Sequence, residues 1–155
     1  MRYRGAVVLV AQQVLPSREA AEDVAQDVFL VAFQSLARLR DPHRFGSWLY
    51  AITRYQARRV LRQEKPTVAL DSELPASGAA HPEGELLRAE AQRELTEALA
   101  SLTPEHRVAF LLRYEEAWPV ARISEFLALP ISTVKWRLHQ ARKQLKRALL
   151  SRAKG

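Results

Sequence analysis

The sequence predicts an all-helical protein (all-α) built from two small modules joined by a linker. Three observations support this prediction. Apolar residues recur at helical spacing on both sides of the middle segment, that segment is rich in Pro, Ala, Ser and acidic residues, and no strand-like alternation of useful length occurs. We place the modules at residues 1–64 and 86–155, and a flexible linker at residues 65–85.

The first module is expected to contain amphipathic helices. Ser17 can cap a helix whose early turns carry acidic residues, where the helix dipole favours them. The expected apolar stripe of this helix consists of Ala25, Phe29, Ala32, Leu36 and Leu39. Pro42 disfavours helical geometry at Asp41, so the helix should end before it, and a second helix should run from about residue 45 to residue 62.

The second module has the pattern of a helix-turn-helix. One helix is expected over about residues 83–100, and Pro104 at the first position after Thr103 should start another that ends near residue 116. A short helix then carries Val120, Ile123 and Leu127 on one face, and Pro130 marks a turn. The long helix that follows has the apolar stripe Ile131, Val134, Leu138, Ala141, Leu145 and Ala148. A short helix, a tight turn and a longer helix form a helix-turn-helix.

Charge is unevenly distributed along the chain. The total is 24 Lys and Arg against 17 Asp and Glu, a net charge of +7, and after Glu125 the chain contains no acidic residue. A helix that only faces solvent normally mixes both signs to form pairs four residues apart. The one-signed end therefore indicates a polyanionic partner.

The long helix carries polar and basic residues opposite its apolar stripe. A helix fits the major groove of B-DNA, and the residues near its N-terminus reach the base edges. This face contains Ser132, Thr133, Lys135, Trp136, His139, Gln140, Lys143 and Arg147. The pattern favours DNA binding, and a solvated basic face on a helical bundle is the alternative.

Composition argues against an enzyme and against a membrane protein. The chain has no cysteine, and its four histidines are scattered without the HExxH spacing of a zinc protease. No run approaches the roughly 18 apolar residues that a membrane span needs, and no signal peptide opens the sequence. We therefore expect a cytoplasmic protein with no catalytic residue, no metal site, no cofactor and no membrane insertion.

Four segments resemble the bacterial sigma-70 family in its compact extracytoplasmic-function (ECF) group. Residues 21–29 (AEDVAQDVF) are similar to the AEDxxQxxF signature of region 2, and residues 45–54 (FGSWLYAITR) to the stretch that follows it. Residues 102–114 resemble the opening of region 4, and residues 133–145 (TVKWRLHQARKQL) its recognition helix. The resemblance covers nearly the whole chain. It implies a region 2 helical bundle, a region 4 helix-turn-helix, and promoter recognition with DNA melting for transcription initiation.

The resemblance implies a role for each surface of the first module. Core RNA polymerase would bind the face formed by Glu22, Asp23, Gln26, Asp27 and Leu30, although an acidic first turn that only satisfies the helix dipole is the alternative. The −10 element would contact His43, Arg44, Tyr50, Arg54, Tyr55, Arg58, Arg59 and Arg62. Melting requires apolar surfaces for unstacked bases and cations for the backbone. Trp48 is expected to pack in the core instead.

In the second module the resemblance implies contact with the −35 element. The residues implied are Ser132, Thr133, Lys135, Trp136, Arg137, His139, Gln140 and Lys143, with Arg142, Lys146 and Arg147 on phosphates. Core RNA polymerase and promoter DNA are the implied partners, and an anti-sigma factor is a further candidate partner. A stand-alone helix-turn-helix transcriptional regulator that dimerises through its first module is the alternative function.

The chain departs from the family pattern at several positions. Tyr55 stands where Asn is usual, which bears on the base preference at −10, and Arg122-Ile123-Ser124 replaces Glu-Ile-Ala. Trp136 stands where Ser is common, so it either alters −35 recognition or packs against the turn. The chain also begins later than the pattern, which leaves an internal start or a shortened first module as alternatives.

Overall fold

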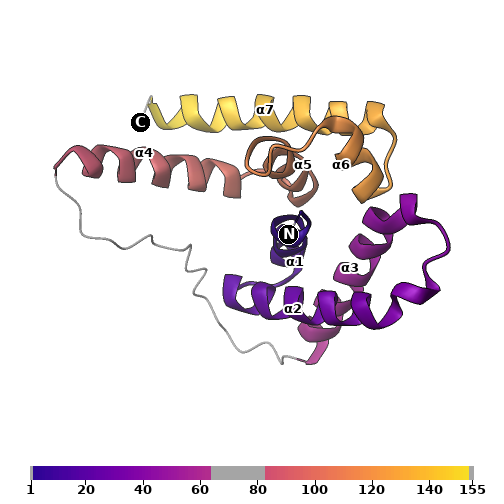
Figure 1. The fold of residues 1–155 in the computed structure, drawn as a ribbon. Coiled ribbons are helices and arrows are strands. Elements are labelled where there is room, and N and C mark those ends of the chain that lie inside the picture. Colours follow the sequence, from indigo (N-terminus) through magenta and orange to yellow (C-terminus); the bar gives the residue numbers. More distant parts are fainter. Residues whose placement is uncertain (1, 64–82, 154–155) are drawn as a thin grey trace.

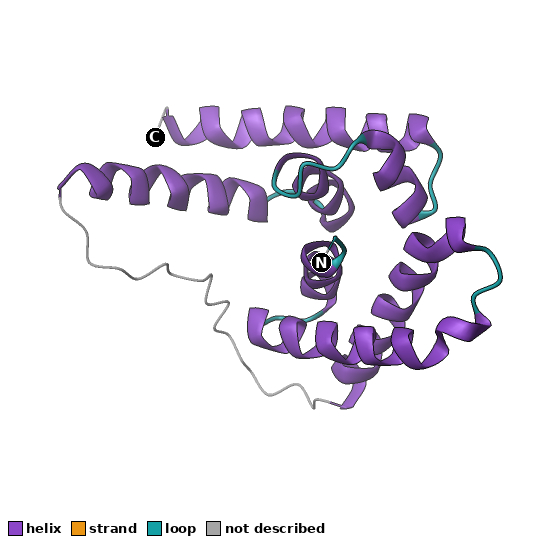
Figure 2. Cartoon of the chain, viewed as in Figure 1, coloured by secondary structure: helices purple, strands orange, loops and turns teal. Residues whose placement is uncertain are grey.

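The computed structural model describes residues 2–63 and 83–153, and every regular element in these ranges is a helix (Figures 1 and 2). The first module contains α1 (Arg4–Val14), α2 (Arg18–Ser35) and α3 (Phe45–Gln63), with short 3-10 turns at Leu36–Arg38 and Pro42–Arg44 between α2 and α3. The second contains α4 (Glu83–Ala100), α5 (Pro104–Tyr114), α6 (Val120–Leu127) and α7 (Ile131–Ala153). The linker predicted to be flexible lies largely outside the described residues. Its predicted end is residue 85, and α4 begins two residues earlier, at Glu83. No helix in the described ranges is long and apolar enough to cross a membrane.

In the first module, α1, α2 and α3 pack on one another around small and β-branched residues. The side chain of Ser17 accepts a hydrogen bond from the Ala20 backbone N–H at 3.0 Å, which confirms the predicted cap of α2. The predicted stripe of α2 was partly wrong. Its buried residues are Ala21, Val24, Ala25, Val28 and Ala32. Leu36 is 48% exposed because α2 ends at Ser35 and the chain leaves the helical path there.

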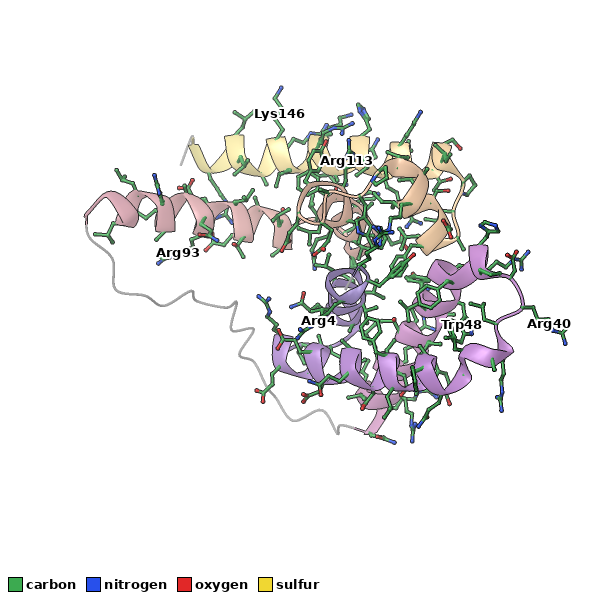
Figure 3. All side chains as sticks on the ribbon, in the orientation of Figure 1. Arg4, Arg40, Trp48, Arg93, Arg113 and Lys146 are labelled. Carbon is green, nitrogen blue, oxygen red and sulfur yellow. The ribbon has the colours of Figure 1, made fainter. Side chains whose placement is uncertain are left out.

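The connection into α3 follows the predicted break. The Asp41 side chain accepts a hydrogen bond from the His43 backbone N–H at 3.0 Å, and Pro42 opens the turn that leads into α3. Trp48 is half-buried and packs against the first-module core, as expected, and Figure 3 shows it among the side chains between α2 and α3. The Thr53 hydroxyl is buried and donates to the Leu49 carbonyl at 2.8 Å, which satisfies this buried polar group.

The second module forms the predicted helix-turn-helix from α6 and α7. Ala128 adopts a left-handed conformation with φ 55° and ends α6, so that the chain turns sharply into α7. The α7 stripe is confirmed at Val134, Leu138, Ala141 and Leu145, which are buried. Ile131, the first residue of α7, is 47% exposed and departs from the predicted stripe.

Arg107 on α5 holds the C-terminus of α4. Its guanidinium donates to the carbonyls of Leu99 at 3.0 Å, Ala100 at 3.2 Å and Leu102 at 2.8 Å. A cation at this end of a helix satisfies free carbonyls and is favoured by the dipole. Burial lowers the pKa of Arg107, but an arginine remains charged at neutral pH. At the far end of α7, Arg152 pairs with Glu97 of α4 and lowers the pKa of that carboxyl.

One of the hydrophobic clusters contains buried residues of both modules. Buried residues of α1 pack in a single cluster with buried residues of α5, α6 and α7; the α1 members are Ala6, Leu9 and Val10. Figure 1 shows α1 lying between α2 and α5, with α6 beside one end of α3. The modules therefore pack directly on each other in this structure.

An aromatic cluster closes the boundary between the modules. Phe126 of α6 is 1% exposed, and its ring centroid lies 5.4 Å from that of Tyr50 and 5.2 Å from that of Trp118. Tyr3 packs edge-on against Phe45 at 5.2 Å and also against Trp118. These five aromatic residues come from both modules, so the contact is apolar and well packed.

Arg122 adds polar contacts at the same boundary. Its guanidinium carbon lies 4.0 Å from the Trp118 ring centroid and 4.8 Å from that of Tyr3. It also donates to the backbone carbonyl of Arg2 at 3.1 Å. The substitution of Arg122 into the family pattern thus places a cation where the two modules meet.

Candidate DNA and protein interfaces

The outer face of α7 gathers most of the predicted −35 residues. Because the buried stripe occupies one side of the helix, the residues opposite it are exposed: Ser132, Lys135, Trp136, His139, Lys143 and Arg147. Thr133 and Gln140 are half-buried at the edges of this face. Arg137 turns toward α5 and pairs with Glu105 at 3.8 Å, with 20% of its side chain exposed. The structure therefore brings these residues to one helix surface, with Arg137 at its margin.

Two of the predicted phosphate-binding residues are exposed on α7 and also line a groove. Arg142 and Lys146 line an open apolar groove of about 440 Å³ together with Phe110, Tyr114, Leu145, Leu149 and Leu150. The Arg142 guanidinium donates to the Tyr114 hydroxyl at 2.7 Å. Figure 3 shows Lys146 pointing away from the protein. Arg147, the third residue, is exposed and does not line this groove.

The predicted −10 residues divide into an outward group and a covered pair. His43 and Arg44 are exposed in the turn before α3, and Tyr55, Arg58, Arg59 and Arg62 are exposed along α3. Tyr50 is half-buried against Phe126 of the second module. The Arg54 guanidinium donates to the Tyr50 hydroxyl at 3.4 Å and lies 5.7 Å from the Tyr50 ring centroid. This pair is therefore engaged at the boundary between the modules.

The predicted polymerase-binding residues share the outer face of α2. Asp23, Gln26 and Asp27 are exposed, and Leu30 is 57% exposed. Glu22 is half-buried and accepts a hydrogen bond from Arg18 at 3.2 Å. The face is acidic at its N-terminal end and apolar further along.

Phe33 extends this apolar part and was not predicted as a site residue from the sequence. Phe33 is 79% exposed, more than any other large apolar residue in the described ranges. It follows Leu30 by three positions, so both side chains lie on one side of α2. An apolar residue at that spacing on a polar face was the signal in the sequence.

Comparisons with known proteins match both modules. The sigma-70 region 2 model matches residues 1–67 and the sigma-70 region 4 model matches residues 92–145. The RNA polymerase sigma factor CarQ of Myxococcus xanthus is 32% identical over 133 residues, which cover 83% of this chain and 74% of that protein. The chain belongs to the sigma-70 family. Within the family it is an ECF factor: the ECF RNA polymerase sigma factor SigW of Bacillus subtilis is 25% identical and covers 95% of this chain and 84% of its own length.

Solved structures of sigma factors share the fold of this ECF factor. CnrH in complex with the cytosolic domain of CnrY matches 97% of this chain and 84% of that chain, with a TM-score of 0.61 and 21% identity. The sigma factor RpoE of Bartonella quintana, in complex with the anti-sigma factor NepR, matches 94% of this chain and 91% of that chain, with a TM-score of 0.59 and 22% identity.

Membership in the sigma-70 family establishes the function at the level of the family. The chain is an RNA polymerase sigma factor that acts in promoter-directed transcription initiation. A stand-alone helix-turn-helix regulator is not favoured, because the region 2 model matches the first module as well.

Proposed function

We propose that this ECF factor binds core RNA polymerase through α2, reads the −10 element with α3 and the turn before it, and reads the −35 element with α7. The observation that supports the proposal best is the one-sided surface of α7. Its basic and polar residues are exposed on a helix-turn-helix whose opposite side is buried in the core. This is the arrangement a recognition helix needs to enter a major groove.

On α7 the proposal separates base contacts from phosphate contacts. Lys135, Trp136, His139 and Gln140 lie within the first three turns, where a recognition helix reaches base edges. Lys143 and Arg147 lie further along the same face, where a helix leaves the groove. We assign phosphate contact first to Arg147, since Arg142 and Lys146 also line the apolar groove and Arg147 does not.

We predict that Gln140→Ala and Arg147→Ala have different effects on −35 binding. Loss of a base contact by Gln140→Ala should cost about 1–3 kcal/mol and relax the preference at one or two positions. Arg147→Ala should weaken all sequences alike and reduce the salt slope by about one. The measurement is the affinity of holoenzyme for a panel of −35 variants at several salt concentrations. A uniform loss with Gln140→Ala, together with a changed preference with Arg147→Ala, would reverse the two assignments.

For the −10 element the proposal assigns two tasks to the first module. The exposed arginines of α3, namely Arg58, Arg59 and Arg62, would hold the backbone of the opened strand. His43 and Arg44 project from the exposed turn, where an unstacked base can be bound. Tyr50 and Arg54 would join them once α6 has moved away from α3. In the arrangement of this structure, called closed here because α6 packs against α3, Phe126 covers Tyr50.

On α2 we assign polymerase binding to the exposed face of Asp23, Gln26, Asp27 and Leu30, extended by Phe33, with Glu22 at its edge. We predict that Gln26→Arg weakens core polymerase binding by at least about tenfold, or 1.4 kcal/mol, because it places a bulky cation in the centre of this face. Helicity and melting should change little, since the side chain is exposed. Gln92→Arg is the matched control, because Gln92 is an exposed glutamine on α4 in the other module. Equal affinity of both variants for core polymerase would contradict the assignment of this α2 face to polymerase binding.

The partners in this proposal are core RNA polymerase, promoter DNA and an anti-sigma factor. The anti-sigma partner is supported by the similar RpoE structure, which was solved with the anti-sigma factor NepR. The chain would act in the cytoplasm as a binding factor without a reaction of its own. The decisive experiment is run-off transcription with purified core enzyme on a genomic promoter library. Specific transcripts should require this chain, and a set of start sites that is the same with core alone would contradict the proposal.

A further inference from the structure

The first turn of α5 contacts the recognition helix through a buried histidine. His106 is 9% exposed, and its ring centroid lies 5.5 Å from that of Trp136, with the ring planes at 75°. Its Nδ1–H donates to the Gln144 side-chain oxygen at 3.2 Å. Trp136 and Gln144 are eight residues apart on α7, so His106 contacts α7 at two points about two turns apart.

The contact with His106 limits how the Trp136 side chain can move. Trp136 is 56% exposed and lies on the outer face of α7, so no core residue covers its outer side. The next residue, Arg137, pairs with Glu105, the neighbour of His106. The edge-to-face contact with His106 supports one side of the indole, and the other side remains exposed as an apolar surface. The ring therefore packs on α5 while it remains accessible from outside.

The chemistry of an indole restricts what it can recognise in a major groove. Its N–H is a donor only, and the rest of the ring is apolar. The apolar feature that the major groove offers is the C5-methyl group of thymine. We propose that Trp136 contacts a thymine methyl in the −35 element and that His106 is the positioning residue that holds the indole for this contact. This inference rests on the proposed function, in which α7 reads the −35 element.

The first test removes the methyl group alone. A −35 element selected from random sequence by the wild-type holoenzyme is synthesised with each thymine replaced in turn by deoxyuridine. At one position the wild type should bind the deoxyuridine form about fourfold more weakly, the effect of one buried carbon. Holoenzyme with Trp136→Ala should bind the two forms equally at that position. The inference would be overturned if the wild type bound the thymine and deoxyuridine forms equally at every position. It would also be overturned if Trp136→Ala discriminated as strongly as the wild type.

Two substitutions of His106 separate positioning from general stability. His106→Phe keeps a ring edge against Trp136 and loses the hydrogen bond to Gln144, whereas His106→Asn keeps a donor near Nδ1 and loses the ring. We expect His106→Phe to retain the fourfold methyl discrimination and His106→Asn to reduce it below about twofold. Melting temperature and helicity of both variants are measured alongside. Equal discrimination in the two variants would show that the ring does not position Trp136.

The outcomes also distinguish this inference from the function it rests on. If wild-type holoenzyme does not protect any −35 element, the proposed function fails and the inference fails with it. If holoenzyme binds the −35 element and Arg147→Ala lowers the affinity for all −35 variants alike, the proposed function stands. The methyl test then decides the role of Trp136 and His106 alone.

Discussion

An engineered disulfide between positions 46 and 126 should abolish transcription from a promoter with both elements, and reduction should restore it. A Cβ atom built at Gly46 lies 3.8 Å from Cβ of Phe126, which is close to the mean Cβ separation of about 3.8 Å in disulfides. The chain contains no cysteine, so Gly46→Cys and Phe126→Cys form the one thiol pair available. The bond would hold α6 against α3.

Promoter geometry explains why this bond should block transcription. Positions −35 and −10 are separated by about 25 base pairs, which is roughly 85 Å of duplex. Four residues lie between Phe126 and Ile131 at the start of α7, and the five residue steps span at most about 18 Å. With Phe126 against α3, the recognition helix starts far too close to α3 for both elements to be read at once. The modules therefore have to separate on the promoter.

The controls for the disulfide separate closure from damage. Phe126→Cys alone, and the reduced double variant, show the effect of losing the Phe126 ring. Run-off transcription under oxidising and reducing conditions is the measurement, with cross-linking checked by mobility on a denaturing gel. Equal transcription from the oxidised and reduced double variant would show that reading both elements does not require separation. Failure of the thiols to cross-link would contradict the closed arrangement itself.

Truncation of Phe126 should destabilise both modules together. Phe126 is 1% exposed and its ring packs against Tyr50 of the first module and Trp118 of the second. Phe126→Ala should lower the free energy of unfolding by about 3–5 kcal/mol, since truncation of a buried aromatic residue leaves a cavity. Because one hydrophobic cluster contains buried residues of both modules, they should unfold in a single transition.

Denaturant unfolding with two fluorescent reporters measures this effect. A variant that keeps only Trp48 reports on the first module, and a variant that keeps only Trp118 reports on the second. The two midpoints should coincide and should shift together on Phe126→Ala. Tyr55→Ala is the matched control, because Tyr55 is an aromatic residue 61% exposed on α3 and its loss should change stability by no more than about 0.5 kcal/mol. Separate midpoints for the two reporters would show that the shared hydrophobic cluster does not couple the modules.

The helices and the recognition face could be predicted from the sequence because their signals are local. Ser17 caps α2, Pro104 begins α5, and the apolar period of α7 predicts which side is buried. The exposed positions of Lys135, His139 and Lys143 follow from the same period. Four short segments also carried the resemblance to the sigma-70 family, and the comparisons confirmed it.

Local signals failed where an element ends or meets a distant one. Leu36 continues the apolar period of α2, yet it is exposed because the helix ends one residue earlier. Phe33 interrupts the polar face of α2. The hydrophobic period of the helix does not by itself show whether another element covers this side chain, and in the structure it is exposed. Ile131 continues the period of the α7 stripe at its first residue, yet it is 47% exposed.

The sequence by itself determined the helical composition, the helix-turn-helix, the basic face of α7 and the family. Only the tertiary structure decided that Tyr50 is covered by Phe126, and that His106 packs against Trp136. It also decided that Arg122 donates to Arg2, 120 residues away in the chain. The physical reason is that hydrophobic periodicity identifies an apolar face without identifying its partner. Which faces meet depends on shape and packing between elements far apart in the chain.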